Sequence, residues 1–211
     1  MFLYALYIFI SPFLWLILLL ASFFNIKIKD HWNELWTTIN SVQNDILKNR
    51  NNRKIILFHA ASAGEFEQLI PILKLINKKK YYIVQSFFSP TIYNKQYNTT
   101  LADSVCYHPF DFIFSSFLFF KKIKPEYYII TRHDIWPSHI LIAKILKIKT
   151  FIINANLYKE SKRLKFPIIH LNKWIFNCFN KILVPSTRIK NNVKLLTSHK
   201  KIIITGDSRF D

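Results

Sequence analysis

Short runs rich in isoleucine, valine and tyrosine alternate with longer apolar stretches along residues 54–207 of this chain. The strand-like runs are KIILFHA, YYIVQSFF, EYYIITR, KTFIINA, KILVPS and KIIITGD. The stretches with helical spacing include EFEQLIPILKLINKK, FDFIFSSFLFFKKI, PSHILIAKILKI and HLNKWIFNCFNK. Alternation of this kind is typical of βαβ units. The sequence therefore predicts an α/β fold with a mostly parallel sheet and helices on both faces.

The composition supports a folded domain with an appendage. The chain has 211 residues, of which 51% are hydrophobic, and this is ample for a core. Its two cysteines, Cys106 and Cys178, have neither metal-ligand nor redox-motif spacing. We predict two buried thiols in a reducing compartment and no metal site.

The chain is strongly basic, with 30 Lys and Arg residues against 12 Asp and Glu residues and a net charge of +18. Codon usage in an AT-rich genome would produce part of this bias, together with the scarcity of glycine. A basic surface still favours anionic partners such as phosphates, nucleic acid or an acidic membrane leaflet. Charge alone does not choose among these partners.

The first segment, MFLYALYIFISPFLWLILLLASFFNI, has no charged side chain before Lys27. A run of this length is sufficient to cross the hydrocarbon core of a bilayer. We predict a membrane anchor helix over residues 1–26, because a cleaved signal peptide would have a basic start and a shorter apolar run. By the positive-inside tendency, the basic residues that follow place the rest of the chain in the cytoplasm. These residues are Lys27, Lys29, Lys48, Arg50, Arg53 and Lys54.

Residues 27–54 are predicted to form a basic amphipathic linker helix between the anchor and the domain. Apolar side chains recur at helical spacing between residues 31 and 49. They are Trp32, Leu35, Trp36, Ile39, Val42, Ile46 and Leu47.

Polar residues gather where the predicted strands end. The segments concerned are HAASAGE, FFSPTIY, TRHDIWPSH, NANLYKES and GDSRFD. In open parallel sheets, ligands bind outside the carboxyl ends of the strands. Gly64, one of two glycines in the chain, precedes Glu65 at a predicted helix start, where backbone N–H groups are free and a small residue lets a ligand approach.

The motifs HAASAGEFEQLIPILKLI, FFSPTIY, HPFDF, RHDIWPSHI, IINANLYKES and ITGDSRFD follow one another in a recognisable order and spacing. In this respect the chain resembles the acceptor-binding half of 3-deoxy-D-manno-octulosonic acid (Kdo) transferases. The resemblance also covers the N-terminal anchor, so it extends over nearly the whole chain.

The resemblance implies a Rossmann-like doubly wound domain over residues 55–211, which is one half of a GT-B fold. The C-terminal nucleotide-binding domain of the family is expected to be absent from these 211 residues. An enzyme of this family is an inverting, metal-independent glycosyltransferase without a cofactor. It transfers Kdo from CMP-Kdo to a lipid A precursor, lipid IVA, on the cytoplasmic face of the bacterial inner membrane, and nucleic acid is not a partner.

The same resemblance suggests individual site residues. Glu65 matches the general base of the family's S-x-G-E motif, while Asp134 and Arg209 match two residues that support the transition state. Residues expected to contact the acceptor are Ser62, Gly64, Ser89, Pro90, Thr91, Arg132 and Asn154. Two positions depart from the family's pattern: Ile92 stands where a glycine is common, and Arg132 where a second acid is common.

Structural interpretations exist for each proposed catalytic residue. Glu65 could be a helix-start residue, Asp134 a helix cap and Arg209 a solvated terminal charge. Structural or surface roles are expected for the histidines, which are His59, His108, His133 and His139 among others. The functional alternatives are a non-catalytic lipid-binding remnant at the membrane and a basic nucleic-acid-binding domain.

Overall fold

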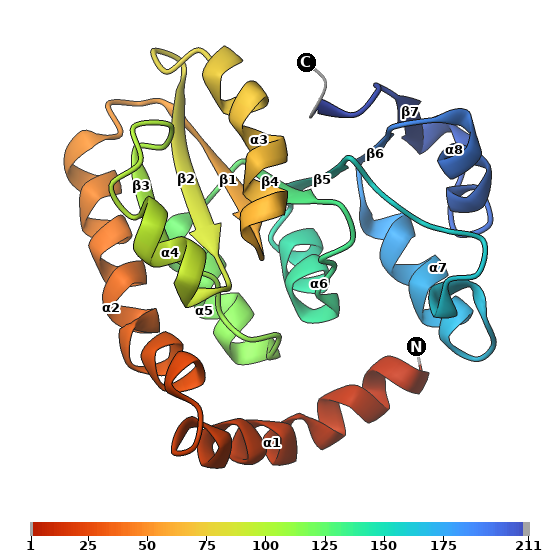
Figure 1. Ribbon diagram of the computed structural model, residues 1–211, viewed down its shortest axis with the longest axis horizontal. Helices are drawn as coiled ribbons and strands as arrows, with labels where there is room; N and C mark the ends of the chain where they lie inside the picture. Colours follow the sequence, from red (N-terminus) through yellow and green to blue (C-terminus); the bar gives the residue numbers. More distant parts are fainter. Residues whose placement is uncertain (1, 209–211) are drawn as a thin grey trace.

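The computed structural model describes residues 2–208 as a layered α/β domain with a long helix at its N-terminus (Figure 1). In chain order, the elements are α1 (Phe2–Ser22), α2 (Ile26–Asn49), β1 (Lys54–Ala60), α3 (Ala63–Leu75), β2 (Tyr81–Phe87), α4 (Pro90–Gln96), β3 (Ser104–Tyr107), α5 (Ile113–Ile123), β4 (Tyr127–Thr131), α6 (Pro137–Ile145), β5 (Lys149–Ile153), η1 (Lys162–Leu164), α7 (Ile168–Cys178), β6 (Lys181–Val184), α8 (Thr187–Val193), η2 (His199–Lys201) and β7 (Ile202–Ile204).

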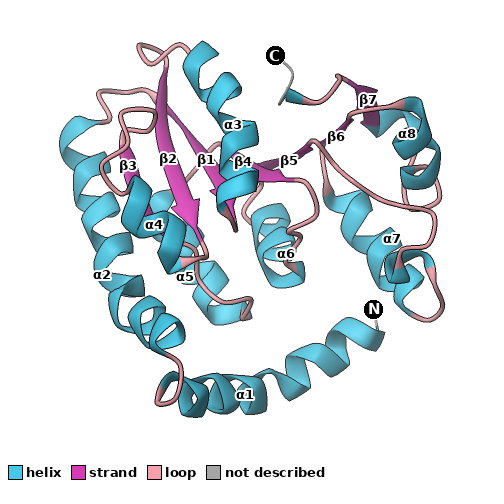
Figure 2. Cartoon of the chain, viewed as in Figure 1, coloured by secondary structure: helices cyan, strands magenta, loops and turns pink. Residues whose placement is uncertain are grey.

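Within the described residues the strands form one seven-stranded sheet in the order β3-β2-β1-β4-β5-β6-β7, and every neighbouring pair is parallel. The chain winds outward from β1 in one direction and then crosses to β4 to wind in the other. The predicted doubly wound parallel sheet is therefore confirmed (Figure 2). Three short elements escaped the sequence analysis, namely β3, α4 and α8.

The two faces of the sheet carry separate apolar cores, because alternate residues of a strand point to opposite faces. Ile55 and Leu57 of β1 pack with side chains of α2, α5, α6, α7 and α8. Ile56 and Phe58 pack with side chains of α3 and with Ile92 of α4. Both cysteines are buried and unpaired, as predicted.

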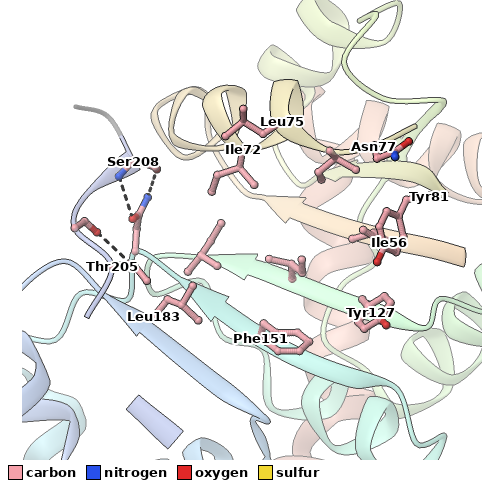
Figure 3. Close-up of a pocket in the computed structure, with 15 residues that line it drawn as sticks. Ile56, Ile72, Leu75, Asn77, Tyr81, Tyr127, Phe151, Leu183, Thr205 and Ser208 are labelled. Carbon is pink, nitrogen blue, oxygen red and sulfur yellow. Dashed lines mark hydrogen bonds between the residues drawn. The ribbon is translucent and has the colours of Figure 1, made fainter. Parts of the chain in front are cut away.

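The face that carries α3 and α4 is only partly covered by described residues. A groove of about 660 Å³ runs over β4, β5 and β6 beside α3 (Figure 3). Its floor is the exposed side of the sheet, including Tyr127, Phe151 and Leu183. Ser208, near the end of the chain, lies at its margin.

Helix α2 begins with a cap and joins the core. The side chain of Asn25 accepts hydrogen bonds from the N–H groups of Lys27 and Ile28, which satisfies free donors at the first turn. Leu35, Ile39, Val42 and Ile46 are buried in the same core as α5 and α6, whereas Leu47 is exposed. Helix α2 therefore provides one wall of the domain core. The predicted boundary between the linker helix and the domain, at residue 54, stays a prediction.

Helix α1 is the one helix among residues 2–208 that is long and apolar enough to cross a membrane. Its 21 residues span about 30 Å. Almost all of its side chains are outside the protein core, with Phe9, Phe13 and Ile17 among the most exposed. This helix could anchor the protein to a membrane.

The N-terminal end of α1 is fixed to the domain by polar contacts. The hydroxyl of Tyr4 donates to Oγ of Ser138 at the start of α6, and the Tyr7 hydroxyl donates to the carbonyl oxygen of Asp111. The ring of Tyr4 also lies 5.1 Å from that of Trp174 in α7. Since α1 also contacts α2, it runs along the domain from α2 to α7 (Figure 1).

We expect that deletion of residues 1–24 releases the protein from membranes into a high-salt extract, whereas the full chain stays in the membrane pellet. The shortened chain keeps α2 and therefore its core. Sedimentation of membranes before and after a salt wash, with immunodetection of the protein, measures this difference. Release of the full chain by salt alone would show that α1 is not an apolar anchor.

Candidate active site

Glu65 lies at the carboxyl end of β1, in the first turn of α3. Its side chain folds back, and Oε2 accepts the N–H of Ala61 at 2.8 Å. Among the described residues, Oε1 of Glu65 has no hydrogen-bond partner. One carboxylate oxygen therefore holds the turn, as the helix-start interpretation expected, and the other remains available for chemistry.

The environment of Glu65 favours its neutral form. The residue is only 5% exposed. Burial raises the pKa of the Glu65 carboxyl, and the nearby charge of Asp134 raises this pKa further, while the Ala61 N–H, His59 and His133 act in the opposite direction. A carboxylate with a raised pKa is a stronger base, and perturbed carboxyls of this kind cluster at functional sites.

Asp134 is held by a histidine from the neighbouring strand. His59, fully buried at the end of β1, has Nε2 at 2.7 Å from Oδ2 of Asp134. Burial alone would raise the pKa of Asp134, but the hydrogen bond and charge of His59, together with smaller effects of Trp136 and His133, hold this pKa below its usual value. Since an ionised carboxylate only accepts hydrogen bonds, Nε2 of His59 is the donor. Asp134 is thus a fixed negative charge beside Glu65.

Below this pair lies a stack of buried imidazole rings. The ring of His59 stacks on that of His108 with centroids 3.7 Å apart, and His108 stacks on His139 at 4.4 Å. Oγ of Ser86 lies within hydrogen-bonding distance of Nδ1 of both His59 and His108, at 3.2 and 3.1 Å. Burial holds the pKa of His108 well below its usual value, so this ring is neutral. The sequence analysis assigned His59 no functional role, and the structure places it in direct contact with Asp134.

Asp111, from the HPFDF motif, fixes the start of α6. Its Oδ1 accepts the backbone N–H groups of Ser138 and His139 at 2.8 and 3.2 Å, and also lies 3.0 Å from Nδ1 of His139. A carboxylate at a helix N-terminus compensates its free donors and partial positive charge. Asp111 therefore couples the β3–α5 loop to the segment that carries Asp134.

Arginines lie on the other side of Asp134. Arg132 has a left-handed backbone, with φ of 58°, and its N–H donates to the carbonyl oxygen of Ile153 at 2.8 Å. It lines two small polar cavities of about 150 and 290 Å³, one shared with Arg188 and the other with Arg163. Nη2 of Arg163 donates to the carbonyl oxygen of His133 at 2.6 Å. These cavities form a basic region at the carboxyl ends of β4, β5 and β6.

Ser62 and Gly64 form the exposed outer side of the α3 start. Ser62 is the N-cap residue, but its hydroxyl makes no capping hydrogen bond. A Cβ added to Gly64 would meet no atom within 4 Å, and the backbone here is not left-handed. The fold therefore does not require glycine at this position, and the space above it is open.

The remaining predicted site residues occupy different positions. Ser89 is the N-cap of α4, Pro90 its buried first residue and Thr91 an exposed one. The Ser89 N–H donates to the carbonyl oxygen of Ala61 at 3.3 Å, so this segment lies beside the Glu65 turn. Arg209, the third predicted catalytic residue, lies outside the described residues.

Asn154 is buried and links α3 to the end of the described chain. Its Nδ2 donates to Oε1 of Gln68 at 3.1 Å and to Oγ of Ser208 at 2.6 Å. Its predicted contact with an acceptor stays a prediction. Within residues 2–208, His, Cys, Asp and Glu side chains form no group of three that could hold a metal ion.

A buried carboxylate with one free oxygen, a fixed second charge and a basic region all lie at the carboxyl edge of a parallel sheet. This arrangement suits proton abstraction from a hydroxyl beside an anionic ligand. The fold is one Rossmann-like half of the GT-B type.

Comparison with known proteins supports this fold and gives the family. Residues 32–211 match the family described as 3-deoxy-D-manno-octulosonic-acid transferase (kdotransferase). The chain belongs to this family. A 3-deoxy-D-manno-octulosonic acid transferase of Aquifex aeolicus (strain VF5) is 35% identical over 109 residues, which are 50% of this chain and 29% of that protein.

Solved structures with the same fold are more distant in sequence. A UDP-GlcNAc 2-epimerase from Neisseria meningitidis, bound to UDP-GlcNAc, superposes with a TM-score of 0.55 at 15% identity and covers 74% of this chain and 47% of that chain. A putative UDP-N-acetylglucosamine 2-epimerase from Listeria monocytogenes superposes with a TM-score of 0.56 at 10% identity. This match covers 74% of this chain and 45% of that chain. The chain spans less than half the length of each of these proteins, and the solved structures establish the fold alone.

We expect the Gly64→Ala substitution to stabilise the protein, because alanine costs less conformational entropy in a helix and its Cβ meets open space here. The gain should be about 0.5 kcal/mol or more. Thermal unfolding followed by circular dichroism measures it. A lower midpoint for Gly64→Ala would show that the fold itself needs this glycine.

Proposed function

We propose that this chain is the acceptor-binding half of a Kdo transferase, an inverting and metal-independent enzyme that transfers Kdo from CMP-Kdo to the lipid A precursor lipid IVA. The reaction takes place on the cytoplasmic face of the bacterial inner membrane, with α1 as the anchor. The observation that carries the proposal is the buried Glu65 carboxylate, whose raised pKa and free oxygen suit a general base.

Glu65 removes the proton from a hydroxyl of the glucosamine disaccharide as that oxygen attacks the anomeric carbon of Kdo. A new C–O bond forms while the bond between Kdo and the phosphate of CMP breaks, and the electron pair leaves with CMP. Attack from the face opposite CMP requires one base, and the proton stays on Glu65 until solvent takes it.

Asp134 and Arg209 support this step in different ways. Asp134 keeps its charge through His59 and so keeps the pKa of Glu65 high. Arg209, as the residue before Phe210 and Asp211, would offset the charge that develops on the departing phosphate. The donor CMP-Kdo binds in the second half of the GT-B fold, which faces this edge of the sheet.

The phosphorylated acceptor binds near Arg132 and the lysines of the linker, which include Lys27. Arg163 and Arg188 line the same cavities as Arg132, and a net charge of +18 adds a favourable field for an anionic lipid. Ser62, Gly64, Ser89, Pro90, Thr91 and Asn154 contact the sugar or line its approach. The basic surface binds a phosphorylated lipid at a membrane in this proposal, and nucleic acid is not its partner.

We expect Glu65→Gln to lower the transfer rate by about 10²–10⁴-fold, because glutamine keeps the size and the hydrogen bond to Ala61 but cannot accept the proton. The measurement is incorporation of labelled Kdo into lipid IVA by membranes that contain this chain together with the donor-binding half. Glu67→Gln, an exposed neighbour in α3, is the matched control and should leave the rate unchanged.

Transfer by Glu65→Gln at near the wild-type rate would show that Glu65 is only a helix-start residue, and the proposal would be wrong. A chain that binds lipid IVA but supports no transfer with any donor-binding half would instead be a lipid-binding remnant.

Asp134→Asn tests the electrostatic coupling between the two carboxylates. Because Asp134 raises the pKa of Glu65, its neutral replacement should lower that pKa. The base is then ionised to lower pH, so the acidic limb of the pH profile of kcat/KM should move to lower pH. Kinetics at several pH values measure the limb in both proteins. An unmoved limb would show that Glu65 does not respond to Asp134.

A further inference from the structure

Two cavities lie near α1 and the first turns of α2. The first, of about 260 Å³, lies between α1, α2 and the start of α5. We call it the aromatic pocket, and its lining residues are Trp15, Trp32, Leu35, Trp36, Phe110, Phe112 and Ser115. The rings of Trp15 and Trp32 lie 5.4 Å apart, and Trp32 lies 5.8 Å from Phe110.

The second cavity, of about 230 Å³, adjoins the first, since Phe110 lines both. It is more polar at its edges, where Asn25, Lys27 and Ser89 lie. The N–H of Ser89 donates to the carbonyl oxygen of Ala61, and the N–H of Ala61 donates to the carboxylate of Glu65. The second cavity therefore borders a segment that is hydrogen-bonded to the turn carrying the candidate base.

The open side of the aromatic pocket meets the surface that α1 presents to its surroundings. Trp15 is 45% exposed, and Phe13 and Leu16 next to it are also exposed. The pocket is too small for a protein helix, which has a diameter of about 10 Å. Its walls are apolar, and the cation Lys27 lines the neighbouring second cavity, so a lipid with a flexible apolar chain and an anionic head matches the two cavities together.

We propose that the aromatic pocket binds one acyl chain of the lipid acceptor, with the head of the lipid at Lys27 and Ser89. This assignment rests on the proposed function, since it takes the acceptor to be an acylated, phosphorylated sugar. The pocket takes a chain out of the leaflet and brings the sugar of the same lipid towards Glu65. Helices α1 and α2 would then contact the acyl chain directly, in addition to the contacts that the chain makes with the bilayer.

Photo-crosslinking tests the occupant directly. The full chain is placed in phosphatidylethanolamine–phosphatidylglycerol vesicles with lipid IVA that carries a diazirine on one acyl chain, and labelled peptides are identified by mass spectrometry. We expect label on Trp32, Trp36 and Phe112, which face the pocket. Label confined to outward residues of α1 such as Phe9 would overturn the proposal.

The source of the chain is tested by a second lipid. Phosphatidylglycerol with the same diazirine should label the outward surface of α1 but not Trp36 or Phe112, and unlabelled lipid IVA should protect the pocket from the labelled form. Equal pocket labelling by phosphatidylglycerol, without protection, would show an ordinary bilayer lipid and overturn the proposal.

Substitutions that fill or open the pocket separate it from general membrane binding. Leu35→Phe fills the pocket and should reduce pocket labelling by about tenfold, because burial of one or two methylene groups corresponds to that factor. Leu47→Phe, exposed on the same helix, is the control. If Leu35→Phe fails to fold, Trp15→Ala removes one wall from α1, with Phe9→Ala as its control.

Unchanged pocket labelling in a folded Leu35→Phe protein, or in Trp15→Ala, would overturn the acyl-chain site. None of these measurements requires transfer of Kdo. A chain that is labelled in the pocket but supports no transfer would therefore refute the enzymatic function and retain the lipid site. Transfer without pocket labelling would refute the lipid site and retain the enzymatic function.

Discussion

Three buried imidazole rings support the edge of the sheet where the candidate site lies. His59, His108 and His139 come from β1, from the residue after β3 and from α6, and all three are fully buried. A buried polar group without a partner costs about 1–3 kcal/mol, so their hydrogen bonds to Asp134, Ser86 and Asp111 fix which elements can meet. The positions of Asp134 and of the start of α6 depend on this stack. The stack influences the pKa of Glu65 through the charge of Asp134, which His59 helps to maintain.

Much of the sheet could be predicted because most strands are apolar, β-branched runs next to clear helical stretches. KIILFHA coincides with β1, and five other predicted runs each contain an observed strand. Ser104–Tyr107 was missed because this strand has four residues and a single β-branched one, Val105. It gains its conformation from pairing with β2 and from α2, which are contacts distant in sequence. Likewise α4 and α8 have seven residues each, too few for a clear apolar period.

The candidate site was harder to predict than the sheet. The position of Glu65 after an apolar strand placed it at a helix start, and its side chain does hold that turn. The contact between His59 and Asp134 joins residues 75 positions apart, and no local sequence pattern predicts it. The histidines showed no metal-ligand spacing along one helix, and such spacing says nothing about rings that stack across strands. Family resemblance supplied Asp134 as a candidate, and the structure adds the histidine that keeps it charged.

The hydrogen bonds between α1 and the domain have a kinetic consequence. Tyr4 and Tyr7 attach α1 to Ser138 at the start of α6 and to Asp111, at the carboxyl edge of the sheet. If α1 lies in a membrane and the acceptor is a lipid, as proposed, the protein meets this substrate by lateral diffusion within a surface. Its rate then follows the number of substrate molecules per unit area of leaflet and is insensitive to the volume of the surrounding solution. Dilution of the substrate lipid by other lipids becomes as effective a control of turnover as a change in the amount of protein.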